Sequence, residues 1–143
     1  MSAAVENRLE IVRALSASPI ARWLGYSAAI EEGGLVHRLG FAERHIGNPA
    51  IRALHGGVIA SFLEFASEVE FSASLGRPEK ARTVSMSIDY MASSKAQDMT
   101  ARVVIARAAR RIAFLEATGW QGDETRPVAA ARVCLRIGEP ARE

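Results

Sequence analysis

Apolar and polar residues follow two different periods along this chain, and the changes of period predict its helices and strands. From about Ala4 to Ala17, apolar residues recur at helical spacing, which predicts a short amphipathic helix that ends at Ser18-Pro19. From His55 to about Leu75 there is no proline and no glycine after Gly57, and the apolar residues favour one helical face. Gly76-Arg77-Pro78 then follows, as is common beyond a helix C-terminus. We therefore predict a long helix over this second segment.

Most of the remaining chain alternates apolar with polar residues, the period of a β-strand. Two strands joined by a turn at Glu32-Gly33-Gly34 are predicted before the long helix, at about Tyr26 to Ile30 and Leu35 to Phe41. Four more are predicted after it, with spacings that suit an antiparallel meander, at about Thr83 to Met91, Thr100 to Ala106, Arg111 to Gln121 and Pro127 to Ile137. In the first of these four, alternate residues are predicted to face the core together: Val84, Met86, Ile88 and Tyr90.

The order of these elements predicts one α+β domain. A long apolar helix between strands must be buried by them, so we expect an antiparallel sheet wrapped around one long central helix. A chain of 143 residues with 49% hydrophobic and 24% charged residues fits a single domain over 1–143, with an N-terminal helical segment at 1–19. No apolar run approaches the roughly 20 residues that span a bilayer, and Met1 to Ala14 is unlike a signal peptide. We expect a cytoplasmic protein that has no membrane segment.

The composition argues against several kinds of site. The single cysteine, Cys134, cannot form an intrachain disulfide, which agrees with a reducing compartment. The histidines His37, His45 and His55 are not spaced as metal ligands, and neither a metal nor a cofactor is expected. The net charge is +2 and the pI is about 9.1, but the arginines are interspersed with acids, so nucleic acid is not an expected partner.

One local cluster of basic residues stands apart from this pattern. Arg107, Arg110 and Arg111 lie close together between two predicted strands. They could bind the phosphates of a small ligand, or they could belong to an exposed turn, and the sequence favours neither.

The run His55-Gly56-Gly57 is the strongest candidate for a functional site. It opens the long helix, where glycine costs little and backbone N–H groups have no intrahelical partner. An anion or a polarised carbonyl could bind there, at the positive end of the helix dipole.

Several motifs together resemble the hotdog-fold thioesterases of the PaaI-like type, which are related to 4-hydroxybenzoyl-CoA thioesterases. The resemblance spans about Ile46 to Ile137 and rests on an Asn-Pro loop at Asn48-Pro49, on His55-Gly56-Gly57, on the acid Glu64 nine residues after the histidine, and on the strand from Thr83. It implies a hotdog fold and hydrolysis of acyl-CoA without a cofactor. Asn48, His55, Gly56 and Glu64 are the implied catalytic residues.

Thioester hydrolysis needs a group that polarises the carbonyl and a base or nucleophile that delivers oxygen to it. The Gly56 N–H could polarise the carbonyl, while His55 fixes the turn or orients the thioester. Glu64 could activate water or attack directly, and the sequence leaves both routes open. The candidate substrate-binding residues are Gly57, Thr83, Phe62, Phe65, Arg107, Arg110 and Arg111.

The spacing of Gly56 and Glu64 predicts a dimer. At about 1.5 Å per residue the two lie roughly 12 Å apart along the helix, too far to contact one carbonyl from the same chain. A two-fold dimer would bring Gly56 of one subunit to Glu64 of the other. Phe71 shares the Glu64 side of the helix, so we expect another subunit to cover that side. The resemblance also implies a homodimer with shared sites, and a dimer of dimers stays open.

Two other functions remain as alternatives to an acyl-CoA thioesterase. The first is a non-catalytic hotdog module that binds acyl-CoA, for which retention of Glu64 would be unnecessary. The second is a hotdog hydratase or dehydratase, which we rank last because the chain has neither their Asp and His arrangement nor a His-Phe-Pro-Gly motif.

Overall fold

A computed structural model describes residues 2–78 and 81–137. Three α-helices and eight strands make up the fold, with a 3-10 turn at Glu43–His45: α1 Ala3–Ser16, α2 Pro19–Leu24, β1 Tyr26–Glu31, β2 Gly34–Leu39, β3 Ile46–Asn48, β4 Ala53–Leu54, α3 Gly56–Leu75, β5 Ala81–Tyr90, β6 Met99–Ala108, β7 Ile112–Trp120 and β8 Ala129–Ile137. The predicted helix, two strands, long helix and four strands are all present in that order, and α2 and the short strands β3 and β4 are additional to it. No helix in the described part of the chain is long and apolar enough to cross a membrane.

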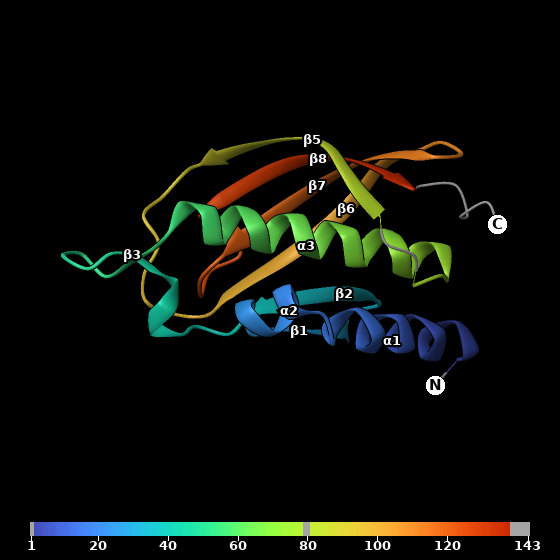
Figure 1. The fold of residues 1–143 in the computed structure, drawn as a ribbon, viewed down its shortest axis with the longest axis horizontal. Helices are drawn as coiled ribbons and strands as arrows, with labels where there is room; N and C mark the ends of the chain where they lie inside the picture. The colour runs from blue at the N-terminus through green and yellow to red at the C-terminus, as the bar shows by residue number, and fades with distance from the viewer. Residues whose placement is uncertain (1, 79–80, 138–143) are drawn as a thin grey trace.

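The antiparallel sheet curves around α3, as predicted (Figure 1). Its strand order is β1-β2-β6-β7-β8-β5, and β3 pairs separately with β4. The last three long strands form the expected meander. The strand β5 does not join it from the β6 side but pairs with β8, so that β5 becomes one edge of the sheet.

A β-bulge corrects the predicted inward face of β5. Thr83 pairs with Leu135 and Ser85 pairs with the next residue, Cys134, so Val84 is the extra residue. The bulge turns Val84 outward, and 57% of its surface is exposed. The prediction that Val84 faces the core is wrong because strict alternation holds only where the pairing is regular. The same prediction is wrong for Tyr90, which ends the strand with 52% of its surface exposed.

The central helix α3 forms where the sequence predicts it, and both of its ends have local causes. His55 is the N-cap, and its side chain accepts a hydrogen bond from the Gly57 N–H. Gly76 ends the helix in the left-handed conformation, with φ of 67°, which glycine adopts without a steric penalty.

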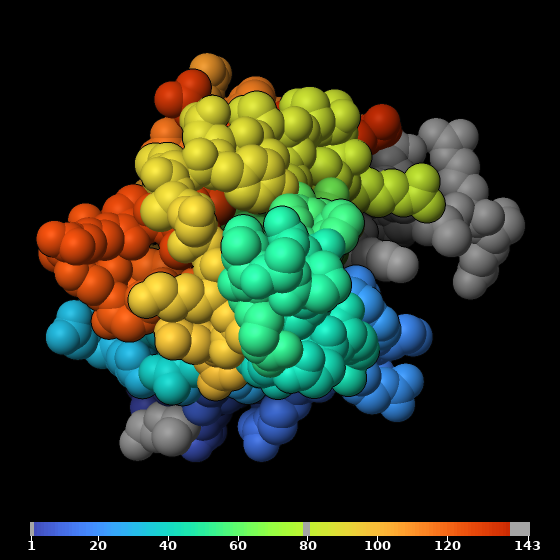
Figure 2. Space-filling model, turned by 90° about the vertical axis from the view of Figure 1, so that its left-hand side faces the viewer, coloured from blue at the N-terminus to red at the C-terminus, as the bar shows by residue number. Residues whose placement is uncertain are grey.

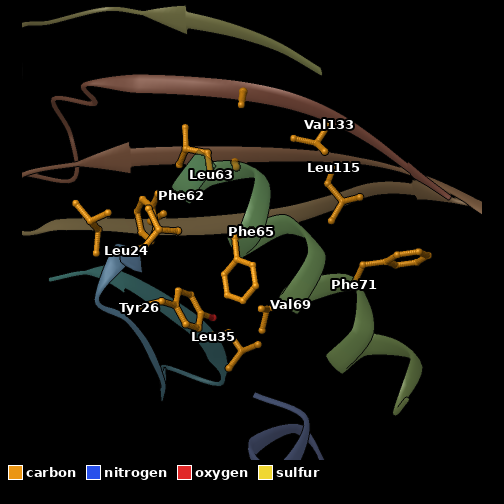
Figure 3. Packing of buried hydrophobic residues seen from close by; sticks show 14 of the residues in the cluster. Leu24, Tyr26, Leu35, Phe62, Leu63, Phe65, Val69, Phe71, Leu115 and Val133 are labelled. Atoms are coloured by element: carbon orange, nitrogen blue, oxygen red, sulfur yellow. The ribbon is translucent and has the colours of Figure 1, made fainter. Parts of the chain in front are cut away.

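The core lies between α3 and the elements that surround it. Phe62, Phe65 and Val69 point from α3 toward α2, β1 and β2, while Leu63 points toward the other strands of the sheet (Figure 3). Phe71 is also buried, with 3% of its surface exposed in the single chain. The expectation that Phe71 needs a second subunit to cover it is therefore wrong, because this chain alone buries it.

A short helix near the N-terminus was not predicted. Ser18 is the N-cap of α2 and Pro19 its first residue, so the Ser-Pro pair that separates α2 from α1 also starts α2. Gly25 ends α2 with φ of 65° and packs against Gly40, where a Cβ would lie 2.7 Å from the Gly40 carbonyl oxygen. This contact fixes α2 beside the loop that leads to α3.

Candidate active site at the start of the central helix

His55 caps α3 with one ring nitrogen and leaves the other available. Its Nδ1 accepts from the Gly57 N–H at 2.9 Å, so in the neutral ring the proton is on Nε2. The residue is exposed, and none of the hydrogen bonds described for residues 2–78 and 81–137 uses Nε2. His55 can therefore donate a hydrogen bond to a ligand without giving up its capping role.

Gly56 is held between the cap and the end of the edge strand. The Tyr90 hydroxyl donates to the Gly56 carbonyl oxygen at 2.7 Å, and a Cβ on Gly56 would lie 3.2 Å from that hydroxyl. The Gly56 N–H has no acceptor among the described residues, as expected for the first residue of a helix. An unpaired N–H at the positive end of α3 is suited to a carbonyl oxygen that gains negative charge.

The strand β3 supports His55 from behind. A Cβ on Gly47 would lie 2.6 Å from the His55 Cα, so only glycine fits here without a shift. The segment 41–55 covers this end of the domain, beside the chain that follows β5 (Figure 2). Side chains of that chain tie the segment down: Asp98 accepts from the Phe41 N–H at 2.7 Å, and Ser94 accepts from the Leu54 N–H at 3.0 Å.

A cavity of about 400 Å³ opens beside the cap. It lies among α2, the 3-10 turn, β3 and the first two turns of α3, and its walls are Trp23, Arg44, Ile46, His55, Gly57, Val58 and Ser61. His55 and Gly57 were predicted from the sequence as site residues, whereas Trp23 and Arg44 were not. In the sequence, Trp23 is visible only as a tryptophan that follows Ser18-Pro19. Its place in the cavity wall follows from the packing of α2 beside α3.

Glu64 lies two turns along α3 from Gly57 and on nearly the same side of the helix. It is half-buried, and its carboxylate takes part in none of the hydrogen bonds and ion pairs of the described residues. Thr83 on β5 is different, because its hydroxyl is buried and is the one such side-chain oxygen or nitrogen in the described chain without a hydrogen-bond partner. An orphaned hydroxyl requires an explanation, since burying one without a partner costs about 1–3 kcal/mol.

The other predicted site residues lie elsewhere. Phe62 and Phe65 belong to the core, where Phe65 meets the Tyr26 ring edge-on at 4.8 Å, and neither lines the cavity. The Asn48 side chain accepts from the Ala50 N–H at 3.1 Å and so closes the turn at Pro49. The exposed residues Arg107, Arg110 and Arg111 lie where β6 turns into β7, at the far end of the strands from Gly56.

The other two histidines are buried and fully hydrogen-bonded. His37 contacts the Tyr26 hydroxyl at 2.8 Å through Nδ1 and Glu70 at 3.0 Å through Nε2. His45 accepts from the Ala42 N–H and contacts the Trp23 carbonyl oxygen at 2.9 Å. Within residues 2–78 and 81–137, no three His, Cys, Asp or Glu side chains are grouped so that they could hold a metal ion.

Comparison with known proteins identifies the family. The model of the thioesterase superfamily matches residues 52–128, which include the cap, α3 and the sheet strands β5, β6 and β7. The chain belongs to the thioesterase superfamily. None of the curated proteins matches it.

Solved structures show the same fold. A Chromobacterium violaceum protein is 29% identical, with a TM-score of 0.71 and coverage of 95% of both chains. The Escherichia coli PaaI protein from the phenylacetic acid degradation operon is 17% identical, with a TM-score of 0.71 and coverage of 95% of this chain and 99% of that one. A Bacillus halodurans protein crystallised with CoA is 17% identical, with a TM-score of 0.77 and coverage of 96% and 93%. The predicted hotdog fold is confirmed.

Proposed function

We propose that this protein hydrolyses acyl-CoA thioesters to a carboxylic acid and CoA, at a site that begins at the N-terminus of α3. One observation carries the proposal. In a member of the thioesterase superfamily, the Gly56 N–H has no acceptor within the described chain, and beside it the His55 Nε2 has no partner there either. Both groups are donors, and both lie at the positive end of a 20-residue helix.

The first chemical step uses these donors. The thioester oxygen accepts from the Gly56 N–H, and the His55 Nε2–H helps to orient it. Charge that develops on this oxygen as the carbonyl is attacked is stabilised more than the neutral ground state, which lowers the barrier. The Tyr90 hydroxyl donates to the Gly56 carbonyl oxygen and so helps to hold this residue in place.

Glu64 is the proposed base or nucleophile, supplied by a second subunit. The edge strand β5 offers its unpaired backbone to a partner strand, and antiparallel pairing of two β5 strands generates a two-fold axis. For Gly56 of one chain to face Glu64 of the other, the axis must cross halfway along the roughly 12 Å between them, about two strand residues back from Tyr90. An axis beside β5 at that level would bring the Gly56 end of one chain toward the Glu64 level of the other. Each dimer would hold two sites.

Thr83 is a proposed member of the same site. Its orphaned hydroxyl lies on β5, the strand that would be shared by the two subunits. A hydroxyl can accept from a water molecule and donate to a carboxylate at the same time. It could therefore hold the attacking water, and that would explain why it has no partner in the single chain.

The decisive experiment offers purified protein a panel of acyl-CoAs and follows the release of free thiol. Wild type should release CoA, and Glu64→Gln, which keeps the size of the side chain but removes its basicity, should lose nearly all turnover. Sedimentation at working concentration should give a dimer or a dimer of dimers. Undiminished turnover in Glu64→Gln would remove Glu64 from the mechanism. Tight binding of acyl-CoA without turnover of any panel member would instead identify a binding module.

A further inference from the structure

The cavity beside His55 has a charge that the proposed hydrolysis does not by itself require. Among its seven lining residues there is one cation, Arg44, and no acid. The neighbouring acid, Glu43, is paired with Arg52 at 2.7 Å, and no described ion pair includes Arg44. The N-terminus of α3 adds positive potential from the opposite wall. A ligand group that complements this cavity is negatively charged.

Arg44 is held rigidly in the cavity wall. Its Nε and Nη2 both donate to the Trp23 carbonyl oxygen, at 2.9 and 2.7 Å, and Nη2 also reaches the Arg22 carbonyl oxygen at 3.3 Å. These carbonyls end α2, where a cation is favoured. The second terminal nitrogen, Nη1, has no described acceptor. The guanidinium therefore combines a fixed position with free donors, which suits a carboxylate.

The indole of Trp23 supplies the apolar wall. The His45 ring meets the indole edge-on, with 5.0 Å between the ring centroids, and the Arg44 guanidinium carbon lies 5.7 Å from the indole centroid. Even so, 43% of the surface of Trp23 remains exposed. Ile46 and Val58 continue the apolar lining toward His55. A volume of about 400 Å³ lies within the usual range for small-molecule pockets, roughly 300–1,000 Å³. The cavity thus has an apolar part and one cationic corner.

We infer that Trp23 and Arg44 select acyl groups with a carboxylate at the end far from the thioester, so that the preferred substrates are ω-carboxyacyl thioesters. This inference rests on the proposed thioester hydrolysis. The cavity contacts His55 and Gly57, so the part of the substrate that fills it is next to the thioester carbonyl, where the acyl group lies. Methylene groups pack on Trp23 and the distal carboxylate accepts from Arg44. Both selecting residues lie outside the segment 52–128 that the family model matches.

The test compares glutaryl-CoA with pentanoyl-CoA, which share the chain length and differ in the distal carboxylate. Wild type should have the higher kcat/KM for glutaryl-CoA. Arg44→Gln should lower that value about 10- to 100-fold, the usual effect of losing a hydrogen bond to a charged group, and leave pentanoyl-CoA within about twofold. Trp23→Leu should lower both values. The matched controls on α2 are Ile20→Ala and Arg22→Gln. Neither Ile20 nor Arg22 lines the cavity, and 42% of the surface of Ile20 is exposed. Neither control should change either value.

Two further arms decide the remaining outcomes. Glutaryl-pantetheine carries the same acyl group but lacks the CoA phosphates. If Arg44→Gln still lowers kcat/KM for this substrate, the anion that Arg44 binds is on the acyl group. If the effect of Arg44→Gln disappears, the anion is on CoA and the inference is overturned. An equal loss for glutaryl-CoA and pentanoyl-CoA in Arg44→Gln would also overturn it, because Arg44 would then only support α2. If wild type hydrolyses no acyl-CoA, the proposed function fails, and calorimetric titration with the same two thioesters takes over. Tighter binding of glutaryl-CoA that Arg44→Gln abolishes would then support the inference, and equal affinities would overturn it.

Discussion

Two histidines of this chain, His37 and His55, have opposite surroundings. His37 is fully buried on β2, and both of its ring nitrogens are bonded, to the Tyr26 hydroxyl and to the Glu70 carboxylate. His55 is exposed at the start of α3, and only one of its nitrogens is bonded, to a backbone N–H. A ring whose nitrogens are both used joins elements of the fold. A ring with one nitrogen to spare can serve a ligand.

The surroundings of His37 show what such a junction holds together. Tyr26 is on β1, His37 on β2 and Glu70 on α3, and Arg8 of α1 lies 3.9 Å from the Glu70 carboxylate. Because ionised Glu70 can only accept, Nε2 of His37 donates to it and Nδ1 accepts from the Tyr26 hydroxyl. Four elements therefore meet through one polar chain that is buried at Tyr26 and His37 and partly exposed at Arg8 and Glu70. Its loss should affect folding before it affects chemistry.

Of the changes that test this contrast, replacement of His55 by asparagine gives the largest expected effect. Asparagine is as good an N-cap as any residue, so the helix start and the free energy of unfolding should stay nearly unchanged. The Nε2–H is lost, and removal of one donor to a developing oxyanion typically lowers kcat about 10²–10³-fold. Thiol release from acyl-CoA under saturating substrate measures the effect. His55→Ala is the companion variant, and it should lose about 1 kcal/mol of stability in addition. An unchanged kcat in His55→Asn would assign His55 to capping alone.

The opposite result is expected for His37→Leu. This change leaves the Tyr26 hydroxyl and the Glu70 carboxylate without their shared partner, and we expect a loss of about 2–3 kcal/mol in the free energy of unfolding. Urea denaturation measures this loss. The kcat per folded molecule should stay within about twofold of wild type, because His37 does not line the cavity beside His55. A stable His37→Leu protein with a greatly reduced kcat would break the distinction between the two histidines.

Gly47→Ala tests whether the backbone of His55 must stay where it is. The new Cβ would lie 2.6 Å from the His55 Cα, so one of the two segments must move. We expect a loss of about 1–2 kcal/mol in stability. We also expect kcat to fall at least about tenfold, because small misplacements of catalytic groups are costly. Gly34→Ala is the matched control, since its Cβ would be 3.9 Å from the nearest atom, a side-chain nitrogen of Arg102. If both variants behave alike, the packing behind His55 has no role in activity.

The sequence predicted those parts of the fold that are set locally. The helix α3 was found because its apolar period, its glycine-rich start and its Gly76-Arg77-Pro78 end are all adjacent in the chain. The pairing of β5 with β8 and the bulge at Val84 depend on contacts between residues 39 to 56 positions apart, which no local period encodes. The same limit hid α2, whose six residues are too few to show a helical period.

The candidate site divides in the same way. His55, Gly56 and Gly57 were found because one short motif contains the cap and its glycines. Trp23 and Arg44 were missed because they reach the cavity from α2 and the 3-10 turn, which only the packing of the folded chain brings beside α3. Residues that act together across sequence distance become visible only when the fold is known.

The smallest effect is expected from Tyr26→Phe, and its pH dependence makes it diagnostic. Burial, and to a smaller extent the charge of Glu70, raises the pKa of Tyr26 well above its ordinary value. The unfolded chain releases this proton near pH 10 while the folded chain keeps it, so the unfolded state binds fewer protons and stability falls as the pH rises above about 10. The contribution of Tyr26 is thus fully present below about pH 10 and is lost above it.

Phenylalanine has no proton to release, so the variant lacks this loss. Below pH 9, Tyr26→Phe should be less stable than wild type by about 1 kcal/mol, because the His37 Nδ1 loses its donor. Between about pH 10 and 11 the difference should shrink by about 1 kcal/mol and approach zero. Urea denaturation of both proteins at pH 7, 9, 10 and 11 measures it, with the two lower values as the internal control. A difference in stability that stays constant to pH 11 would mean that the Tyr26 hydroxyl is not buried against His37. The structural role assigned to His37 would then be contradicted.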